Sequence, residues 1–253
     1  MNNVLITGAS SGIGKDLAYI FAQNGFNLIL VARRNENLLQ IQKEIQEAHG
    51  VIVVIIAMDL SKLESANLLL EQLSNKSLEV DVLVNNAGFG LSDSFEEMDA
   101  EREADMLVLN IVTLTKLSRL LGKQMISRKQ GHIVNISSAA AFQAVPGFSS
   151  YAASKAYVLS FSEAIEHELK PYGVNVTTIC PGATQSEFAT VAKANEKIFA
   201  KAPSSQELAQ FTFDAFKNNK GTTANGLMGN MMIFGLRFTP RKMATKIAAM
   251  MMK

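Results

Sequence analysis

Short, almost uninterrupted apolar segments alternate along this chain with longer amphipathic ones. The segments expected to form buried strands are residues 4–6, 27–31, 51–57, 80–84, 131–136 and 174–179. Helices are expected over residues 13–24, 36–48, roughly 96–128, and 150–170. Strands without polar alternation, each followed by a helix, are typical of a parallel sheet covered on both faces. We therefore expect an α/β fold: a three-layer, Rossmann-type, doubly wound sheet of about seven strands with right-handed crossovers.

Length and composition fit a single globular domain over residues 1–253. Of the 253 residues 48% are hydrophobic and 19% charged, and single α/β domains often run to ~250 residues. We expect no membrane span, because no apolar run reaches ~18 residues, and no secretory signal, because the start lacks a charged region and a cleavage site. One cysteine and three scattered histidines predict neither a disulfide nor a metal site, and they favour a cytoplasmic location.

The first expected strand leads directly into a glycine-rich turn, Thr7 to Gly14 (Thr-Gly-Ala-Ser-Ser-Gly-Ile-Gly). Glycines allow the backbone to approach a pyrophosphate, and the helix that follows presents its N-terminal N–H groups to that anion. The spacing Gly-x3-Gly-x-Gly between strand and helix predicts a dinucleotide site, with a plain glycine turn as the alternative. The cofactor-binding residues expected here are Gly8, Ser10, Ser11, Gly12, Ile13 and Gly14.

The end of the second expected strand indicates which dinucleotide is preferred. An acidic side chain at this place binds the ribose 2′-hydroxyl of NAD, but the chain has Arg33 and Arg34 after Ala32. Guanidinium groups suit a 2′-phosphate through charge-assisted bonds. The pair therefore predicts NADP(H), with two solvated surface arginines as the alternative.

Tyr151 and Lys155 are four residues apart and share a face of the helix expected over 150–170. A shift of three units in the pKa of a tyrosine requires ~4 kcal/mol, and a cation at ~4 Å in an effective dielectric of ~20 supplies a similar amount. A lysine beside a tyrosine can thus make the phenol a usable acid or base. Alone, the pair is equally well explained by a helix surface.

Other motifs stand in a fixed order around this pair. Asn85-Asn86-Ala87-Gly88 follows the fourth expected strand, Ser138 precedes Tyr151 by thirteen residues, and Pro181-Gly182 follows the sixth strand. Together with the turn at Thr7 to Gly14, they closely resemble the classical short-chain dehydrogenase/reductase family over residues 3 to 190.

The resemblance implies specific roles. Tyr151 exchanges a proton with the substrate oxygen, Ser138 hydrogen-bonds that oxygen, and Lys155 lowers the pKa of the tyrosine and holds the nicotinamide ribose. Asn110 matches the asparagine that supports a water chain to the lysine, although a helix-kinking polar residue explains it as well. The resemblance also implies cofactor contacts by Asp59, Leu60, Asn86, Ala87, Gly88, Pro181, Gly182 and Ser186, in addition to Tyr151 and Lys155. Metal ligands are not implied.

Apolar residues predict where the substrate pocket lies. Residues 139–150 carry no charge, and the expected pocket walls are Phe89, Phe142, Val145, Phe148 and Phe188. Residues 183–225, which include Val191, Ile198 and Phe199, match the segment that acts as a substrate lid in this family. Packing in the core explains some of these phenylalanines equally well. An apolar pocket favours a hydrophobic ketone or aldehyde.

Residues 226–253 form a basic, methionine-rich tail. Seven of the chain's 24 lysines and arginines, but no Asp or Glu, follow Asp214, and seven of its 12 methionines lie in this tail. A short basic amphipathic helix can lie on an anionic membrane, whereas a subunit contact or a cap over the substrate pocket is the reading we favour. The tail offers no basic face or aromatic platform suited to nucleic acid.

We therefore expect an NADP(H)-dependent enzyme that interconverts a carbonyl and an alcohol on a small, hydrophobic substrate by hydride transfer. The resemblance also implies a homodimer or homotetramer built through helices around 100–128 and 150–170. The alternative from another class is a regulatory protein that binds NADP(H) without turnover. Intact Tyr151, Lys155, Ser138 and Asn110 favour the enzyme.

Overall fold

The computed structural model describes residues 2–192, 202–225, 229, 231, 234–236 and 238–251. Seven parallel strands form one sheet in the order β3-β2-β1-β4-β5-β6-β7, which confirms the expected Rossmann-type fold. The strands are β1 (Asn3–Thr7), β2 (Asn27–Ala32), β3 (Val53–Ala57), β4 (Val82–Asn85), β5 (Gly131–Ile136), β6 (Val174–Cys180) and β7 (Thr222–Ala224).

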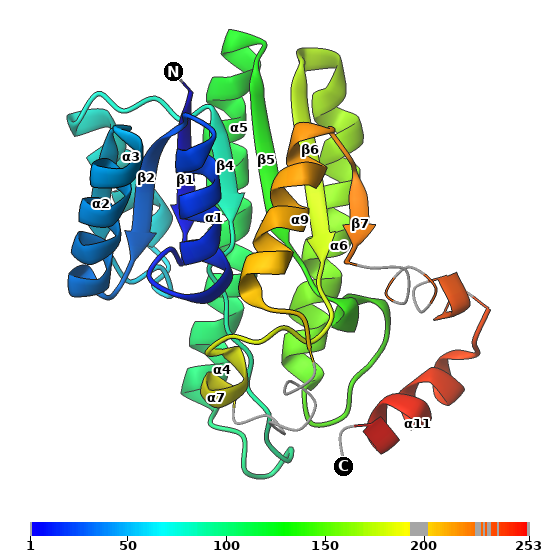
Figure 1. Cartoon of the computed structure of the whole chain (residues 1–253). Helices are drawn as coiled ribbons and strands as arrows, with labels where there is room; N and C mark the ends of the chain where they lie inside the picture. The colour runs from blue at the N-terminus through cyan, green and yellow to red at the C-terminus, as the bar shows by residue number, and fades with distance from the viewer. Residues whose placement is uncertain are drawn as a thin grey trace.

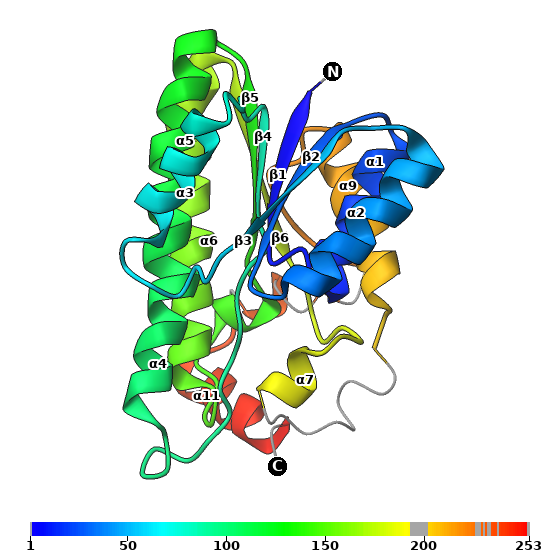
Figure 2. The same ribbon diagram turned by 90° about the vertical axis from the view of Figure 1, so that its left-hand side faces the viewer.

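Helices cover both faces of the sheet. On one face lie α1 (Gly12–Gln23), α2 (Asn35–His49) and α9 (Ser205–Lys217), and on the other α3 (Ser65–Asn75), α5 (Leu114–Arg128) and α6 (Ser149–Leu169) (Figures 1 and 2). Two hydrophobic cores fill the spaces between these layers. Phe21 of α1 packs edge to face on Phe26 and Phe213 in the first core, and Leu121 and Ile165 lie in the second. Burial of this apolar area is the main favourable contribution to folding.

The structure corrects the expected boundaries of several elements. Strand β3 starts at Val53 and β4 at Val82, two residues later than expected in each case. Val51 and Val80 are buried, which explains the expectation, but they precede the first residues that pair with a neighbouring strand. The helix expected from residue 96 begins at Ala100 as α4 (Ala100–Leu107), where the carboxylate of Asp99 accepts hydrogen bonds from the amides of Glu101 and Arg102. Such a cap satisfies N–H groups that have no partner within the helix.

The segment 183–225, expected to form a lid, is divided by the fold. Leu208, Ala209 and Phe213 of α9 belong to the first hydrophobic core, and β7 pairs with β6 at the edge of the sheet. Residues 205–224 are therefore part of the doubly wound layers and not of a lid. Gly182 to Ala192, with the short helix α7 (Phe188–Val191), remain at the carboxyl end of the strands.

The strand order reverses between β1 and β4, which are paired through Ile6 and Val84. In open α/β sheets, ligands bind outside the carboxyl ends of the strands at such a point. Both α7 and the C-terminal helix α11 (Arg241–Met251) lie beyond this end of the sheet (Figure 2). None of the helices that the structure describes is long and apolar enough to span a bilayer.

Candidate active site

The turn after β1 brings two stretches of backbone together more closely than a side chain would allow. Gly8 and Gly12 have positive φ angles of 69° and 50°, which glycine adopts without steric cost. A Cβ on Gly14 would lie 2.4 Å from the carbonyl oxygen of Gly8 and 2.5 Å from Nδ2 of Asn86. The glycine spacing read from the sequence therefore reflects a tight contact between the turn and the start of α1.

The loop after β4 is fastened to this turn. Asn86 donates from Nδ2 to the carbonyl oxygen of Thr7 at 2.9 Å and to that of Gly8 at 3.3 Å. The hydroxyl of Thr7 in turn accepts from the amides of Asn86 and Ala87. The side chain of Asn86, a residue expected to contact the cofactor, thus holds the shape of the turn. Thr7, which the sequence indicates only as part of the glycine-rich motif, is the residue of the turn to which this loop is bound.

A cavity of about 620 Å³ opens at the carboxyl ends of the strands. Its wall brings together the turn, the loops after β2, β3 and β4, the end of β5 and the start of α6. The expected cofactor-binding residues in the wall are Gly8, Ser10, Ser11, Gly12, Ile13, Arg33, Arg34, Asp59, Leu60, Asn86, Ala87, Gly88, Tyr151, Lys155, Pro181, Gly182 and Ser186. Gly14 is not in the wall and lies behind Gly8.

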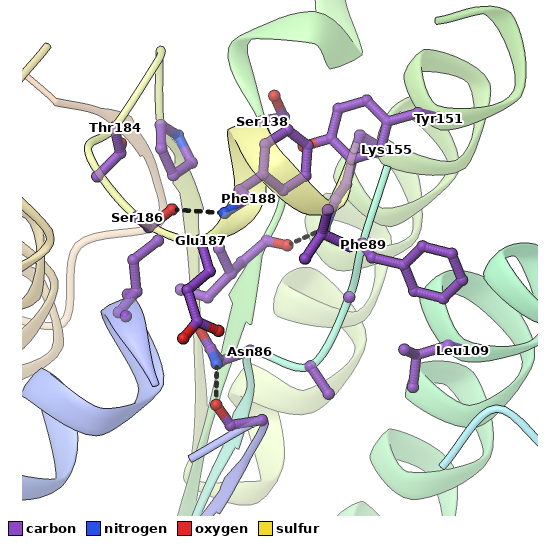
Figure 3. A pocket seen from close by; sticks show the side chains of 18 of the residues that line it. Asn86, Phe89, Leu109, Ser138, Tyr151, Lys155, Thr184, Ser186, Glu187 and Phe188 are labelled. Atoms are coloured by element: carbon purple, nitrogen blue, oxygen red, sulfur yellow. Dashed lines mark hydrogen bonds between the residues drawn. The ribbon is translucent and has the colours of Figure 1, made fainter. Parts of the chain in front are cut away.

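Ser138, Tyr151 and Lys155 lie in the same wall (Figure 3). Lys155 is 6% exposed, and its Nζ donates to the carbonyl oxygen of Ile136 at 2.8 Å. Ser138 caps a short 3-10 helix, and its Oγ accepts from the amide of Ala140 at 3.1 Å. That bond uses one of the two acceptor sites of the hydroxyl, and its single proton serves the hydrogen bond with Tyr151. Ser137, by contrast, donates to the carbonyl oxygen of Lys155 and anchors α6.

Burial controls the ionisation of the pair. It raises the pKa of Tyr151 to about 12, and a hydrogen bond with Ser138 acts in the opposite direction. Burial also lowers the pKa of Lys155 to about 8. The expected lowering of the pKa of Tyr151 by Lys155 is therefore outweighed, because desolvation disfavours the phenolate and Nζ lies 5.8 Å from the centre of the tyrosine ring. At neutral pH the phenol keeps its proton and Lys155 is charged.

Asn110 lies within a one-turn π-helix, η1 (Val108–Thr113), between α4 and α5. Its Nδ2 donates to the carbonyl oxygen of Phe89 at 3.0 Å and to Oγ of Ser154 at 3.1 Å, and its Oδ1 accepts from the amide of Phe89. A π-turn inside a helix is rare and frequent at functional sites. The irregular helix suggested by this polar residue is present, and Asn110 ties the loop after β4 to the helix that carries Tyr151.

Aromatic side chains surround Tyr151 on the substrate side of the cavity. The rings of Phe188 and Phe148 lie with centroids 5.3 Å and 5.8 Å from that of Tyr151, and Phe89 and Val145 also line the wall. Phe142 was expected there, but it packs against the buried cluster of Ala141, Leu159, Cys180 and Ala224 and is not in the wall. Val191 lines the wall, whereas Ile198 and Phe199 lie outside the described residues.

The C-terminal helix reaches the same cavity. Ala248 of α11 lines its wall and is 3% exposed, and Ala244 is 6% exposed. The larger Met243, Ile247 and Met250 are on the exposed side of α11. Helix α11 thus packs on the body through Ala244 and Ala248, with Met243, Ile247 and Met250 facing outward, a distribution that periodicity alone does not predict.

Arg33 and Arg34 both line the cavity but differ in their contacts. Arg33 is exposed. Burial raises the pKa of Asp59, but hydrogen bonds from the amide and hydroxyl of Ser61, with a smaller contribution from the charge of Arg33, lower it overall. Arg34 donates to Oγ of Ser10 at 3.3 Å and of Ser11 at 2.5 Å, and it forms an ion pair with Glu187 at 2.8 Å. Glu187 was missed as a site residue, because nothing in its sequence context points to Arg34.

The family model described as short chain dehydrogenase matches residues 2–197. The chain belongs to the short-chain dehydrogenase family. One curated relative, an uncharacterized oxidoreductase of Staphylococcus saprophyticus, is 36% identical over 179 residues, which are 70% of this chain and 76% of that protein. This membership confirms the resemblance read from the motifs.

Two solved structures share the architecture of this short-chain dehydrogenase. A short-chain dehydrogenase from Sphingobium yanoikuyae in complex with NADPH superposes with a TM-score of 0.85 at 30% identity, covering 95% of this chain and 96% of the other. The bulky-bulky ketone specific alcohol dehydrogenase from Comamonas testosteroni has a TM-score of 0.80 at 28% identity, with coverages of 94% and 92%. Among the described residues, no group of three or more His, Cys, Asp or Glu side chains is placed to hold a metal ion.

Proposed function

We propose that this short-chain dehydrogenase is an NADP(H)-dependent enzyme that interconverts a bulky, hydrophobic ketone or aldehyde and the corresponding alcohol. One observation carries the proposal: Tyr151, Ser138 and Lys155 share one cavity with the glycine-rich turn and with two arginines. A proton donor and a dinucleotide cradle in one cavity are the two parts that carbonyl reduction requires.

The residues present fit an NADP(H) molecule. α1 has no acidic residue in its first turn and no hydrogen bond from the Ser11 side chain to cap its amides, so its positive end can face a pyrophosphate. The contact between Gly8 and Gly14 keeps this part of the cradle free of Cβ atoms. Arg33 and Arg34 line the same cavity, guanidinium groups suit a 2′-phosphate, and the related Sphingobium enzyme was solved with NADPH. When bound, NADP(H) supplies or accepts the hydride.

The protein's own groups position and protonate the substrate oxygen. Tyr151 holds a proton at neutral pH and donates it to the carbonyl oxygen in the reductive direction. Ser138 donates its hydroxyl proton to the same oxygen, because the hydroxyl can turn from Tyr151 to the substrate while its Oγ still accepts from the amide of Ala140. Lys155, anchored on Ile136, places a positive charge beside the tyrosine and would hold the ribose of a bound cofactor. Asn110 holds the loop of Phe89 against the start of α6 by hydrogen bonds to both.

The substrate class follows from the walls of the cavity. Phe148, Phe188, Val145 and Val191 offer apolar surface around Tyr151, and apolar walls with few polar groups favour hydrophobic ligands. The structurally similar Comamonas enzyme is specific for bulky-bulky ketones, which supports a substrate with apolar groups on both sides of the carbonyl. Gly182 to Ala192 serve as the lid, and α11 caps the mouth through Ala248.

The expected result of an NADPH-oxidation screen is turnover with bulky apolar ketones and little turnover with charged sugars. NADPH should be used at least tenfold more efficiently than NADH, because charge-assisted bonds to a phosphate are each worth about 1.5–3 kcal/mol. Arg34→Gln should reduce kcat/KM for NADPH by about tenfold and leave that for NADH within a factor of two. Arg119→Gln is the matched control, since Arg119 is an ion-paired surface arginine outside the cavity. Equal use of NADH and NADPH by the unaltered enzyme would contradict the cofactor assignment.

Efficiency toward NADPH should depend on the charge of Lys155. Its pKa is lowered to about 8 by burial, so the ammonium is present below pH 8 and is lost as the pH rises above it. Because kcat/KM reports ionisations of the free enzyme, we expect kcat/KM for NADPH to fall above about pH 8 at saturating ketone. Tyr151, with a pKa raised to about 12, stays protonated over this range. A profile level to pH 10 would show that the lysine charge is not needed for binding.

We further propose a cytoplasmic homodimer or homotetramer assembled through α4, α5 and α6. On the outer face of α6, Tyr157 is 40% exposed and stacks on Phe161 with an interplanar angle of 11°. Aromatic side chains are enriched at protein interfaces, which supports assembly through this face.

A further inference from the structure

A forked ion pair joins two walls of the cavity. Arg34 lies at the N-terminus of α2, next to the end of β2, and Glu187 lies at the N-terminus of α7 in the lid. Nη1 of Arg34 donates to Oε1 of Glu187 at 3.2 Å, and Nη2 donates to Oε2 at 2.8 Å. Figure 3 shows the Glu187 side chain extending from the lid into the cavity. The pair therefore connects residues 153 positions apart across the proposed cofactor site.

All three nitrogens of the Arg34 guanidinium are engaged. Nε donates to Oγ of Ser10, and Nη2 also donates to Oγ of Ser11. This set of a forked guanidinium and two hydroxyls is one that binds either a carboxylate or a phosphate. Glu187 supplies the carboxylate. Its pKa is lowered chiefly by the hydrogen bond from Arg34, so the side chain is ionised at neutral pH.

We propose that Glu187 competes with the 2′-phosphate of the cofactor for Arg34, and thereby sets how strongly NADP(H) is preferred over NAD(H). This inference rests on the proposed function. Glu187 is followed directly by Phe188, whose ring lies against Tyr151. A phosphate that takes the guanidinium releases the carboxylate that tethers α7. Recognition at the adenosine end is thus coupled to the aromatic wall at the catalytic end.

The location and the geometry of this pair set it apart from the other surface ion pairs. Exposed ion pairs contribute little to the stability of a fold, particularly when a single bond joins two flexible side chains. Arg119 and Glu168 form such a pair on α5 and α6 at 3.3 Å, and their side chains are 56% and 54% exposed. Arg34 and Glu187 are similarly exposed, at 46% and 54%. Their contact is bidentate, and both residues line the cavity.

The test is calorimetric titration with 2′,5′-ADP and with 5′-AMP, which differ by the 2′-phosphate. Glu187→Gln keeps the shape of the side chain and removes its charge. We expect this variant to bind 2′,5′-ADP about fivefold more tightly than the unaltered enzyme, as suits loss of an exposed competitor, and to bind 5′-AMP within a factor of two. Glu168→Gln removes the same charge from a matched ion pair outside the cavity and should change neither affinity.

Two results would overturn the competition. The first is an unchanged affinity of Glu187→Gln for 2′,5′-ADP. The second is an equal increase in affinity for 2′,5′-ADP and 5′-AMP, which would indicate that the lost charge acts on the electrostatic potential of the whole cavity and not on the 2′-phosphate. If the unaltered enzyme bound 2′,5′-ADP no more tightly than 5′-AMP, the proposed NADP(H) preference itself would fail. If that preference were present and were lost in Arg34→Gln, while Glu187→Gln changed nothing, only the competition would be overturned.

The coupling to the lid has its own readout. Without any ligand, Glu187→Gln should increase amide hydrogen exchange over residues 186–192, because the tether to Arg34 is weakened. Glu168→Gln should leave the exchange of this segment unchanged. Equal exchange in Glu187→Gln and the unaltered enzyme would show that the ion pair does not hold the lid.

Discussion

Tyr151→Phe is expected to lower kcat for ketone reduction by about 10²–10⁴-fold, the usual contribution of a positioned general acid. The substitution removes one oxygen and keeps the ring, which packs between Phe148 and Phe188. The affinity for NADPH, measured by fluorescence titration, should therefore change by less than about threefold, since less than ~1 kcal/mol of contact energy is altered. Steady-state oxidation of NADPH with the best ketone from the screen gives kcat.

The same helix provides the control. Tyr157 lies six residues further along α6, is 40% exposed, and its hydroxyl is 3.1 Å from Oγ1 of Thr115. Tyr157→Phe removes the same atom outside the cavity and should retain full turnover. Substantial turnover by Tyr151→Phe would mean that another group protonates the substrate. An unaltered enzyme that binds NADPH but turns over no carbonyl would favour the regulatory alternative.

Gly14→Ala is expected to lower the free energy of unfolding by about 3 kcal/mol, at the upper end of the usual cost of overpacking. The added Cβ would lie 2.4 Å from the carbonyl oxygen of Gly8 and 2.9 Å from its carbonyl carbon, and backbone cannot move aside as a flexible side chain can. It would also lie 2.5 Å from Nδ2 of Asn86, which holds the turn through Thr7. Because the cradle is distorted, the Kd for NADPH should rise at least tenfold, equivalent to ~1.4 kcal/mol.

Gly122→Ala is the matched control for this prediction. Gly122 is also buried in a helix, α5, but a Cβ there would meet only Cδ1 of Ile133 at an ordinary 3.7 Å. Alanine restricts the unfolded chain and favours the helix, so this variant should be more stable by about 0.5–1 kcal/mol. Denaturant unfolding and NADPH titration measure both effects. Unchanged NADPH binding by Gly14→Ala would show that the close approach of the two glycines is not required.

The sequence determined the layered fold because hydrophobic periodicity and glycine positions are local signals. Strand-like apolar runs predict a parallel sheet wherever they are followed by helices, and the turn at Gly8 to Gly14 marks the end of β1. The same signals did not identify residues 205–224 as part of the sheet and its helices, because the pattern of apolar residues that precedes them is irregular. Only the pairing of β7 with β6 and the packing of α9 on α1 show that residues 205–224 belong to the core.

The sequence also determined which residues gather at the carboxyl ends of the strands, because motif order in a doubly wound sheet fixes which loops meet there. Tertiary structure decided what each of those residues does. Burial, and not the neighbouring Lys155, governs the pKa of Tyr151. Asn86 holds the turn, Phe142 packs away from the cavity, and Glu187 reaches Arg34 from 153 residues away. Desolvation and long-range side-chain contacts depend on the surroundings of an atom in space, and sequence spacing does not encode them.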